Sequence, residues 1–574
     1  ARQMYIQGHR QYEHHLQHYG HPSQQGYKDI IPLWHAEKWD PDRLMALYKR
    51  AGARYFVSMG VHHDNFDLWN SKHNPWNAVK MGPKRDVVGQ WQKAAHKQGL
   101  RFGVSEHLGA SFTWFQTSHG SDKEGPLAGV PYDGADPRYE SLYHFPAEPG
   151  DTGWYSTNPR WHRMWFERIR DLVDSYHPDL LYTDGGVPFG NAYGLAMIAH
   201  LYNSDAARRG GKTEVIYNCK EQSEGRWVED LERGVMVGIN PYPWQTDTSL
   251  GDWFYNADWQ YRDAEWVIRM LLDIVSKNGN LLLNVVQRPD GSLDPEVERT
   301  LERMAEWISA NGEGVYGTRP WIIHGEGPVR AKGGHFAEDY AFTAADIRFT
   351  WKRGVLYAFA LGKPADGKIT VRALSTEAGQ GRVRNVTILG CIARPVWRQD
   401  AEGLTVTLPD APVSGIAVGL KVTGTRLREF TPPAPVTAVA RPDAIGAYHL
   451  RVEDAELHGA GIRTERRGGK DNVGFWDSAA EWPEWRLEMT QRGTYEVRLA
   501  VATPHEGVRV TVELAGQPRE VIIQSTGSWD QYAEVVAGRF VIGSTGTVAL
   551  SVRPKDHATW KAINLADVRV SKVD

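Results

Sequence analysis

The first part of the chain alternates between helical and strand-like hydrophobic patterns. Apolar positions recur at helical spacing after Asp40-Pro41, and Gly52 ends that stretch. The run Arg54–Val61 that follows is short and apolar, which is typical of a parallel strand buried on both faces. The alternation continues with predicted helices at 86–99, 158–176, 262–277 and 294–312, and predicted strands at 101–105, 179–183, 214–217, 235–239 and 280–286. Such βα units predict a (β/α)8-like TIM barrel, an α/β fold, over residues 1–318, with an aromatic-rich insertion at about 108–157.

The pattern changes near Arg319. Short strands broken by Gly, Pro and Asp predict a β-sandwich over residues 319–428. A stretch rich in Pro and Ala at 429–446 reads as a linker, and residues 447–574 have a second all-β pattern. We therefore expect a barrel domain followed by two β-sandwich domains.

Composition narrows the classes of function. The 574 residues carry a net charge of −4 and no basic stripe, which argues against a nucleic-acid partner. The two cysteines lie far apart and form no metal motif, and no apolar run is long enough to span a membrane. The 23 tryptophans lend mild support to sugar binding, because aromatic rings pack against the apolar faces of pyranoses.

Polar side chains follow four of the predicted strands, and barrel strands bring their last residues to one mouth. These side chains are His62-His63-Asp64, Glu106-His107, Asp184 and the segment 229–233. Two carboxylates that flank a sugar ring can serve as nucleophile and acid/base, and imidazoles can bind its hydroxyls. By itself Asp184 could equally be a strand-ending cap. A metal site from His62, His63 and a carboxylate is the alternative, although adjacent histidines on a strand point to opposite sides unless a bulge intervenes.

Several long segments carry a family resemblance. They are WDPDRLMALYKRAGARYFVSMGVHHDNFDLWNSKHNPWNAVKMGPKRDVVGQW, PDLLYTDGG, PWQTDTSLGDWFY, DIVSKNGNLLLNV and NGEGVYGTRPW. Together they resemble the family-29 α-L-fucosidases over roughly residues 20–430. The resemblance implies a retaining exo-glycosidase that removes α-linked L-fucose without a metal or other cofactor. It makes Asp184 the nucleophile, with Tyr182 in place of the usual Trp beside the sugar. His62 and His63 match a pair that binds ring hydroxyls.

The resemblance leaves the acid/base within the segment WVEDLERG. We favour Glu232 over Glu229, because Glu232 precedes Arg233-Gly234 at an expected loop near the mouth. The other residues that we expect around the sugar are Glu106, His107, Lys220 and Trp244. For Trp244 and Trp253, core packing is an equally good interpretation.

The last domain resembles β-sandwich carbohydrate-binding modules that begin with a Glu-Ala-Glu motif. That motif reads Asp454-Ala455-Glu456 here, followed by NVGFW, WPEW, GTYEV and INLADV. Relatives hold a structural calcium between this motif and an Asp of the last strand. Ala566 stands at the expected position, next to Asp567, so calcium is doubtful. The candidate sugar contacts are Trp476, Trp482, Trp485 and Trp560, of which two could be core residues.

The sequence thus predicts an exo-acting α-L-fucosidase whose partner is a fucosylated glycan or polysaccharide. One alternative is a non-catalytic sugar-binding protein on the same scaffold, and another is the same mechanism on a sugar such as an α-L-galactoside. The family's first barrel strand would precede Ala1, so we expect the natural chain to begin earlier, with a secretory signal, and to be secreted or periplasmic. Ala1 should then lie near the barrel mouth.

Overall fold

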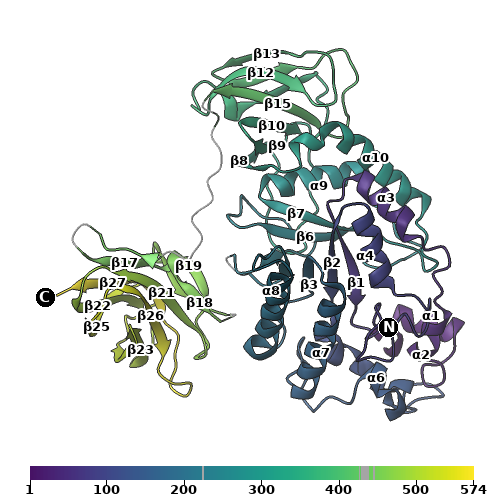
Figure 1. Cartoon of the computed structure of the whole chain (residues 1–574), viewed down its shortest axis with the longest axis horizontal. Coiled ribbons are helices and arrows are strands. Elements are labelled where there is room, and N and C mark those ends of the chain that lie inside the picture. The colour runs from purple at the N-terminus through teal and green to yellow at the C-terminus, as the bar shows by residue number, and fades with distance from the viewer. Residues whose placement is uncertain (223–224, 426, 428–438, 444–445, 460, 574) are drawn as a thin grey trace. The chain divides into compact units, whose positions relative to one another are not determined.

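The computed structural model describes residues 1–574 except 223–224, 426, 428–438, 444–445, 460 and 574. The chain forms two compact units, Ala1–Thr431 and Pro432–Asp574, and each is described by itself (Figure 1). Most of the predicted linker at 429–446 lies outside the described residues. Within the described part of the chain, we find no helix with the length and apolar character needed to cross a membrane.

A parallel sheet of seven strands forms the centre of the first unit. The strands pair in chain order and are β1 (Tyr55–Val61), β2 (Arg101–Glu106), β3 (Leu180–Thr183), β4 (Ile216–Cys219), β5 (Val228–Asp230), β6 (Trp244–Ser249) and β7 (Gly279–Asn284). The Tyr55 hydroxyl lies 3.0 Å from Gln245 Oε1 and 3.2 Å from the Leu281 carbonyl, to either of which it can donate, so β1 reaches across to β6 and β7. The sheet is therefore curled like a barrel, as predicted. Among the described residues, however, no strand pairing joins β7 to β1.

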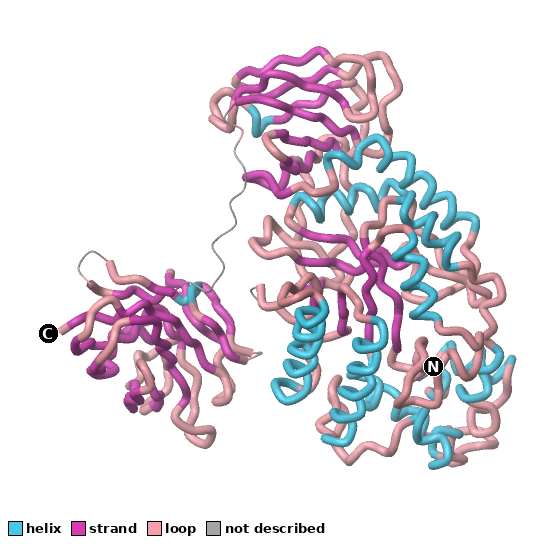
Figure 2. The backbone as a smooth tube through the Cα atoms, in the orientation of Figure 1, coloured by secondary structure: helices cyan, strands magenta, loops and turns pink. Residues whose placement is uncertain are grey.

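Helices cover the outside of this sheet (Figure 2). The larger ones are α3 (Pro41–Ala51), α4 (Val87–Lys97), α7 (Pro159–Tyr176), α8 (Ala196–Arg208), α9 (Ala264–Ser276) and α10 (Pro295–Asn311). Three of these six begin at the predicted caps: the side chains of Asp40, Asp86 and Asn158 accept hydrogen bonds from backbone N–H groups of the first turn. Gly52 ends α3 in the left-handed conformation, at φ 115°.

Short helices precede and interrupt the barrel. They are α1 (Arg10–His18) and α2 (Tyr27–Ile30) before β1, and α5 (Ser111–Trp114) and α6 (Glu140–Tyr143) within the predicted insertion. Arg2 lies over the ring of Trp114, with its guanidinium carbon 4.3 Å from the centroid, and Trp114 in turn lies 5.2 Å from His63. The start of the described chain is thus close to the mouth residue His63, as expected.

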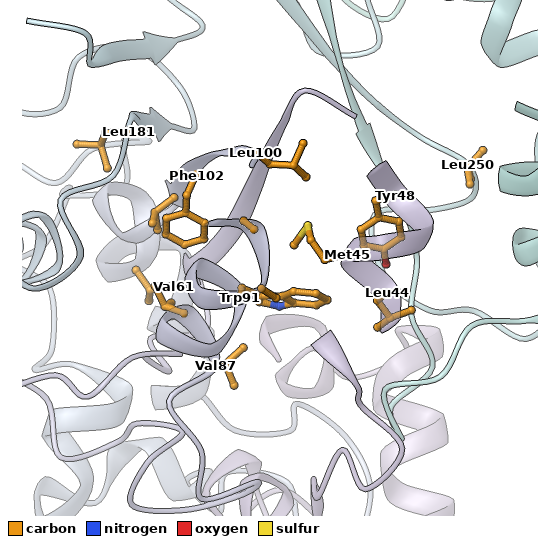
Figure 3. Packing of buried hydrophobic residues seen from close by; sticks show 14 of the residues in the cluster. Leu44, Met45, Tyr48, Val61, Val87, Trp91, Leu100, Phe102, Leu181 and Leu250 are labelled. Atoms are coloured by element: carbon orange, nitrogen blue, oxygen red, sulfur yellow. The ribbon is translucent and has the colours of Figure 1, made fainter. Parts of the chain in front are cut away.

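The barrel core lies between the helices and the sheet. Figure 3 shows side chains of α3 and α4 together with those of β1 and β2. The Trp91 ring of α4 lies 4.7 Å from Phe56 and 6.4 Å from Tyr48, between centroids. Amphipathic helices and doubly covered strands make this packing possible, which is why the hydrophobic pattern identified most of the elements.

One predicted strand was wrong. The apolar stretch 235–239 is not a strand; among the described residues, Val235 makes an isolated bridge, to Gly334. The strand is β6 instead, whose sequence WQTDTS is mostly polar although all six residues are buried. Its alternate side chains Gln245 and Asp247 hydrogen-bond to other polar groups of the barrel strands, so β6 lacks the apolar run by which buried strands are found.

Two antiparallel sheets follow the barrel. The five-stranded sheet has the order β12-β15-β10-β9-β8 and the three-stranded one the order β11-β14-β13. The bounds are β8 (Arg319–Glu326), β9 (Ile347–Lys352), β10 (Val355–Ala360), β11 (Lys368–Val371), β12 (Arg382–Ile388), β13 (Val396–Asp400), β14 (Gly403–Thr407) and β15 (Val418–Thr425). The core of this two-sheet domain contains the buried residues Trp321, Phe349 and Leu356. The domain packs on the barrel helices: the Trp307 indole of α10 donates to the Ala417 carbonyl at 3.0 Å.

The second unit is a β-sandwich of two six-stranded sheets, ordered β16-β21-β26-β23-β24 with β18 beside β21, and β19-β20-β27-β22-β25 with β17 beside β27. The bounds are β16 (Val439–Ala440), β17 (Tyr448–Arg451), β18 (Glu456–His458), β19 (Arg463–Arg467), β20 (Lys470–Gly474), β21 (Trp482–Met489), β22 (Gly493–Ala502), β23 (Val508–Leu514), β24 (Gln517–Ile523), β25 (Ala533–Ile542), β26 (Gly546–Pro554) and β27 (Asn564–Lys572). The unit has a hydrophobic core of its own.

Candidate active site

The residues that follow β1, β2, β3 and β4 meet at one end of the sheet. The parallel ladder continues past the strand ends: the His107 N–H donates to the Val61 carbonyl at 2.9 Å, and the Asp184 N–H to the Glu106 carbonyl at 3.1 Å. The Lys220 N–H likewise donates to the Gly185 carbonyl at 2.8 Å. Backbone hydrogen bonds therefore hold these side chains in fixed positions side by side.

Asp184 lies at the centre of this group and is 9% exposed. Its Oδ2 is 3.0 Å from His107 Nδ1 and 3.4 Å from His63 Nε2, and its Oδ1 is 2.6 Å from Lys220 Nζ. Burial acts to raise the pKa of Asp184, but His107, His63 and Lys220 outweigh it and hold the pKa well below its usual range. The carboxylate is therefore ionised across the neutral and mildly acidic range.

Lys220 joins Asp184 to the predicted acid/base. Its Nζ is also 2.5 Å from Glu232 Oε2, so one ammonium lies between the two carboxylates. Burial acts to lower the pKa of Lys220, but Asp184, Asp247 and Glu232 outweigh it and raise the pKa. A permanently charged ammonium thus holds both carboxylates at the mouth.

Glu232 and Glu229 have different surroundings. Glu229 lies within β5, where it pairs with Cys219 and Trp244, and burial raises its pKa. The next residue, Asp230, is directed into the barrel, so Glu229 projects to the opposite face of the strand. Glu232 follows β5 and is the member of the segment that contacts Lys220.

The loop after β3 is shaped by Tyr155 from the predicted insertion. The Tyr155 hydroxyl lies 3.1 Å from the Asp184 carbonyl and 2.7 Å from the Gly186 carbonyl, to which it can donate. Gly185 has a φ of 95°, and a Cβ there would lie 2.6 Å from the Tyr155 oxygen. The close approach of Tyr155 therefore requires the glycine.

Three imidazoles form one wall of the site. The His62 ring stacks on His107 with centroids 4.4 Å apart and lies 4.5 Å from His63. Both adjacent histidines can reach the mouth because β1 ends at Val61, so they are not bound to the alternation of an extended strand. His63 Nδ1 lies 2.8 Å from the His107 carbonyl, which fixes the ring with Nε2 directed at Asp184.

Beneath Asp184 lies a pair of buried carboxyl groups: Asp230, which belongs to the candidate segment WVEDLERG, and Asp247, which the sequence analysis did not single out. The Tyr182 hydroxyl is 3.1 Å from Asp230 Oδ2 and 3.2 Å from Asp247 Oδ2, and Gln245 Nε2 donates to Asp230 at 2.8 Å. Burial and the mutual interaction of the two groups raise the pKa of Asp230. Burial also raises the pKa of Asp247. The alternate positions of Gln245 and Asp247 in the sequence could have indicated a strand with one polar face.

Three predicted sugar contacts are corrected by the structure. Glu106 is fully buried and accepts hydrogen bonds from the Trp165 indole and the Thr183 hydroxyl, so it faces helix α7. Trp244 is also fully buried, with its indole donating to the Lys277 carbonyl at 2.9 Å. Tyr182 is 3% exposed and its hydroxyl is engaged with the interior carboxyl pair. These three side chains contact other parts of the protein interior and do not line the open side of the site.

Trp154 is a site residue that the sequence analysis missed. It comes from the insertion, is 43% exposed and lies 5.2 Å from His63, between ring centroids. A Cβ on Gly185 would lie 2.7 Å from its indole nitrogen, so the ring borders the loop that carries Asp184. Long insertions carry little periodicity, and their placement over a site depends on tertiary contacts.

The aromatic candidates of the second unit divide into two groups. Trp476 and Trp485 are buried in its core, which corrects their assignment as sugar contacts. Trp482 and Trp560 are only partly buried. In the first motif, Asp454 accepts two hydrogen bonds from the Arg451 guanidinium, at 2.9 and 3.2 Å. The Arg451 guanidinium thus pairs with the first carboxylate of the motif.

Comparisons with known proteins agree with this geometry. The family model described as Alpha-L-fucosidase matches residues 1–313, and the Alpha-L-fucosidase C-terminal domain matches residues 341–423. Tissue alpha-L-fucosidase of Rattus norvegicus is 27% identical over 400 residues, which are 67% of this chain and 75% of the relative. The Homo sapiens tissue enzyme is 25% identical over 426 residues, 70% of this chain and 78% of the relative.

Solved structures give the same result. The alpha-fucosidase of Thermotoga maritima in complex with fucose has a TM-score of 0.56 at 27% identity, covering 74% of this chain and 87% of that one. An alpha-L-fucosidase from Vibrio sp. strain EJY3 shares the fold, with a TM-score of 0.53 at 16% identity, covering 96% of this chain and 90% of that one. The matched family model spans more than half of the residues and includes every side chain of the candidate active site. This chain belongs to the alpha-L-fucosidase family of glycoside hydrolases.

Proposed function

We propose that this chain is a retaining exo-α-L-fucosidase that releases terminal α-L-fucose from a glycan or polysaccharide. The observation that supports it is the pairing of Asp184 and Glu232 through Lys220. Because Asp184 Oδ1 and Glu232 Oε2 both contact Lys220 Nζ, these two oxygens lie no more than about 5 Å apart, which fits the ~5–5.5 Å between the carboxyl groups of retaining enzymes.

The roles follow from the surroundings of each carboxylate. Asp184 is held ionised by its donors, as a nucleophile that attacks the anomeric carbon must be. Glu232 donates a proton to the leaving oxygen and then removes one from the water that hydrolyses the fucosyl-enzyme. To act as the acid it must carry a proton, so the bound substrate has to separate Glu232 from the Lys220 ammonium.

The histidines fit sugar binding better than a metal site. His62, His63 and His107 bring ligand atoms within 4.8 Å of one another. His107 Nδ1, however, lies 3.0 Å from Asp184 Oδ2, which as an acceptor takes its proton. A nitrogen that donates to a carboxylate cannot bind a cation at the same time. The proposed reaction accordingly uses no metal or other cofactor.

The test is the variant Asp184→Asn, which keeps the shape and removes the nucleophile. Turnover of an aryl α-L-fucoside should fall by several powers of ten, roughly 5–8 kcal/mol in barrier, while the circular dichroism spectrum is unchanged. NMR of the first product of the wild-type chain should show α-L-fucose. Near-normal turnover by the folded variant, or release of β-L-fucose, would contradict the proposal.

A further inference from the structure

A loop of the sandwich domain lies against the segment that carries Glu232. This loop, residues 327–346, connects β8 to β9. Val235 and Gly334 exchange backbone hydrogen bonds at 3.2 and 2.9 Å. The Phe336 N–H donates to the Glu232 carbonyl at 2.8 Å, and the Glu232 N–H donates to His335 Nδ1 at 3.0 Å. Both backbone groups of Glu232 are therefore held by the β8–β9 loop.

The far side of the loop is anchored to the barrel. Glu338 is 7% exposed and accepts a hydrogen bond from the Thr248 hydroxyl of β6 at 2.6 Å. Its other oxygen is 3.1 Å from Arg233 Nη1, beside Glu232 in the chain. Buried charge-assisted contacts of this kind fix geometry more firmly than surface pairs do. The loop is thus a built part of the mouth.

Phe336 is unusual for an anchored residue. Its backbone is in the left-handed region, at φ 53°, where glycine is favoured and a phenylalanine is strained. Its side chain is 69% exposed, so the ring gains little from burial in the fold. The chain thus bears both backbone strain and an exposed ring directly beside the residue that protonates the leaving group.

We propose that Phe336 is the stacking platform for the leaving-group sugar, the residue to which the fucose is attached. This inference rests on the proposed function and extends it to the substrate. Glu232 must contact the glycosidic oxygen, so the sugar on the far side of that oxygen extends past Glu232. The pyranose of that sugar has an apolar face suited to an aromatic ring. Trp154, next to Gly185 and His63, borders the Asp184 side instead.

Two substrates separate this role from the chemistry of the site. An α-L-fucosyl fluoride has a single atom as its leaving group, whereas an α-L-fucosyl-galactose disaccharide has a pyranose. In the full-length protein, Phe336→Ala should lower kcat/KM about tenfold for the disaccharide and leave that for the fluoride within about twofold. Phe336→Trp should keep the disaccharide rate, because the ring is retained.

Phe475→Ala is the matched control. Phe475 is also exposed, at 45%, and also has a positive φ, of 52°, but it lies in the second unit. It should change neither rate. An unchanged disaccharide rate in Phe336→Ala, or an equal loss on both substrates, would overturn the platform. Failure of the wild-type chain to hydrolyse the fluoride would instead refute the proposed function itself.

Discussion

At the scale of single residues, the site depends on hydrogen-bond donors gathered around Asp184. Two imidazoles and one ammonium lie within 3.4 Å of its carboxylate. Each stabilises the ionised form, and Lys220 extends that stabilisation to Glu232. Because the pKa of Asp184 is far below its usual range, a loss of activity on mild acidification would have to come from another group.

The choice between Glu232 and Glu229 can be tested by their alanine variants. Glu232→Ala should slow hydrolysis of a fucosyl disaccharide by about 10²–10⁴-fold, because a sugar leaving group needs its proton. An activated aryl fucoside should be affected far less, and added azide should restore turnover as an α-L-fucosyl azide. The measurement is product analysis by NMR with and without azide.

Glu229→Ala serves as the control in the same segment. Because Glu229 projects from the opposite face of β5 to Asp230, its removal should not produce the azide product. Azide rescue of Glu229→Ala but not of Glu232→Ala would show that the acid/base is Glu229.

The sequence predicted the site residues that follow the strands. It did not predict which of the neighbouring side chains project between the sheet and the helices instead. His63, His107 and Asp184 each follow a strand, which is why the sequence pointed to the mouth. Glu106 precedes His107 by one position, and a period of two residues sends its side chain to the opposite face, toward Trp165. The sequence predicts where the strand lies. It does not determine on which face of the sheet the last side chain of the strand projects, because a shift of one residue reverses that face.

At the scale of elements, a buried charged network fastens the sandwich domain to the barrel. Asp273 of α9 lies 2.7 Å from Lys277 Nζ and 2.5 Å from Arg348 Nε of β9. All three side chains are at most 4% exposed. Burial lowers the pKa of Lys277, although Asp273 opposes that effect. The ammonium and guanidinium thus depend on one carboxylate.

Asp273→Ala should therefore lower the free energy of unfolding of the first unit by about 3–5 kcal/mol, because it leaves two buried cations without their anion. Denaturant unfolding followed by fluorescence measures this. Glu265→Ala removes a carboxylate from the same helix, but its pairs with Arg269 and Arg303 are half-exposed, so it should cost at most about 1 kcal/mol. Equal losses in the free energy of unfolding for the two variants would show that burial of the network does not add to stability.

Strand β6 escaped prediction for a physical reason. The sequence pattern identifies strands by apolar runs, and β6 presents Gln245 and Asp247 to a polar interior. The interior is polar because Asp230 and Asp247 both lie there, within 3.2 Å of the Tyr182 hydroxyl. Single-sequence patterns detect burial in an apolar layer and miss burial in a hydrogen-bonded one.

At the scale of the whole molecule, the chain consists of two compact units. The active-site residues and the β8–β9 loop all lie in the unit Ala1–Thr431, and the second unit has its own core. Weak binding of a glycan by the second unit stays a prediction, supported by the partly buried Trp482 and Trp560.

A chain ending at Thr431 should hydrolyse a small aryl fucoside with a kcat/KM within about twofold of the full length, because every active-site contact is retained. A chain ending at 318 should lose activity, since it lacks the β8–β9 loop that holds both backbone groups of Glu232. Full activity of the shorter chain would show that the loop does not position Glu232.

The β8–β9 loop also bears on which part of the chain determines substrate specificity. The nucleophile and the histidines belong to the barrel, whereas the groups that hold Glu232 in place belong to the sandwich domain. Recognition of fucose and recognition of what the fucose is attached to are thus encoded in separate, exchangeable stretches of the gene. A chimera that keeps the barrel and takes residues 327–346 from a relative should inherit the relative's preference among glycosidic linkages, much as antibodies change their antigen by replacing loops on a constant frame.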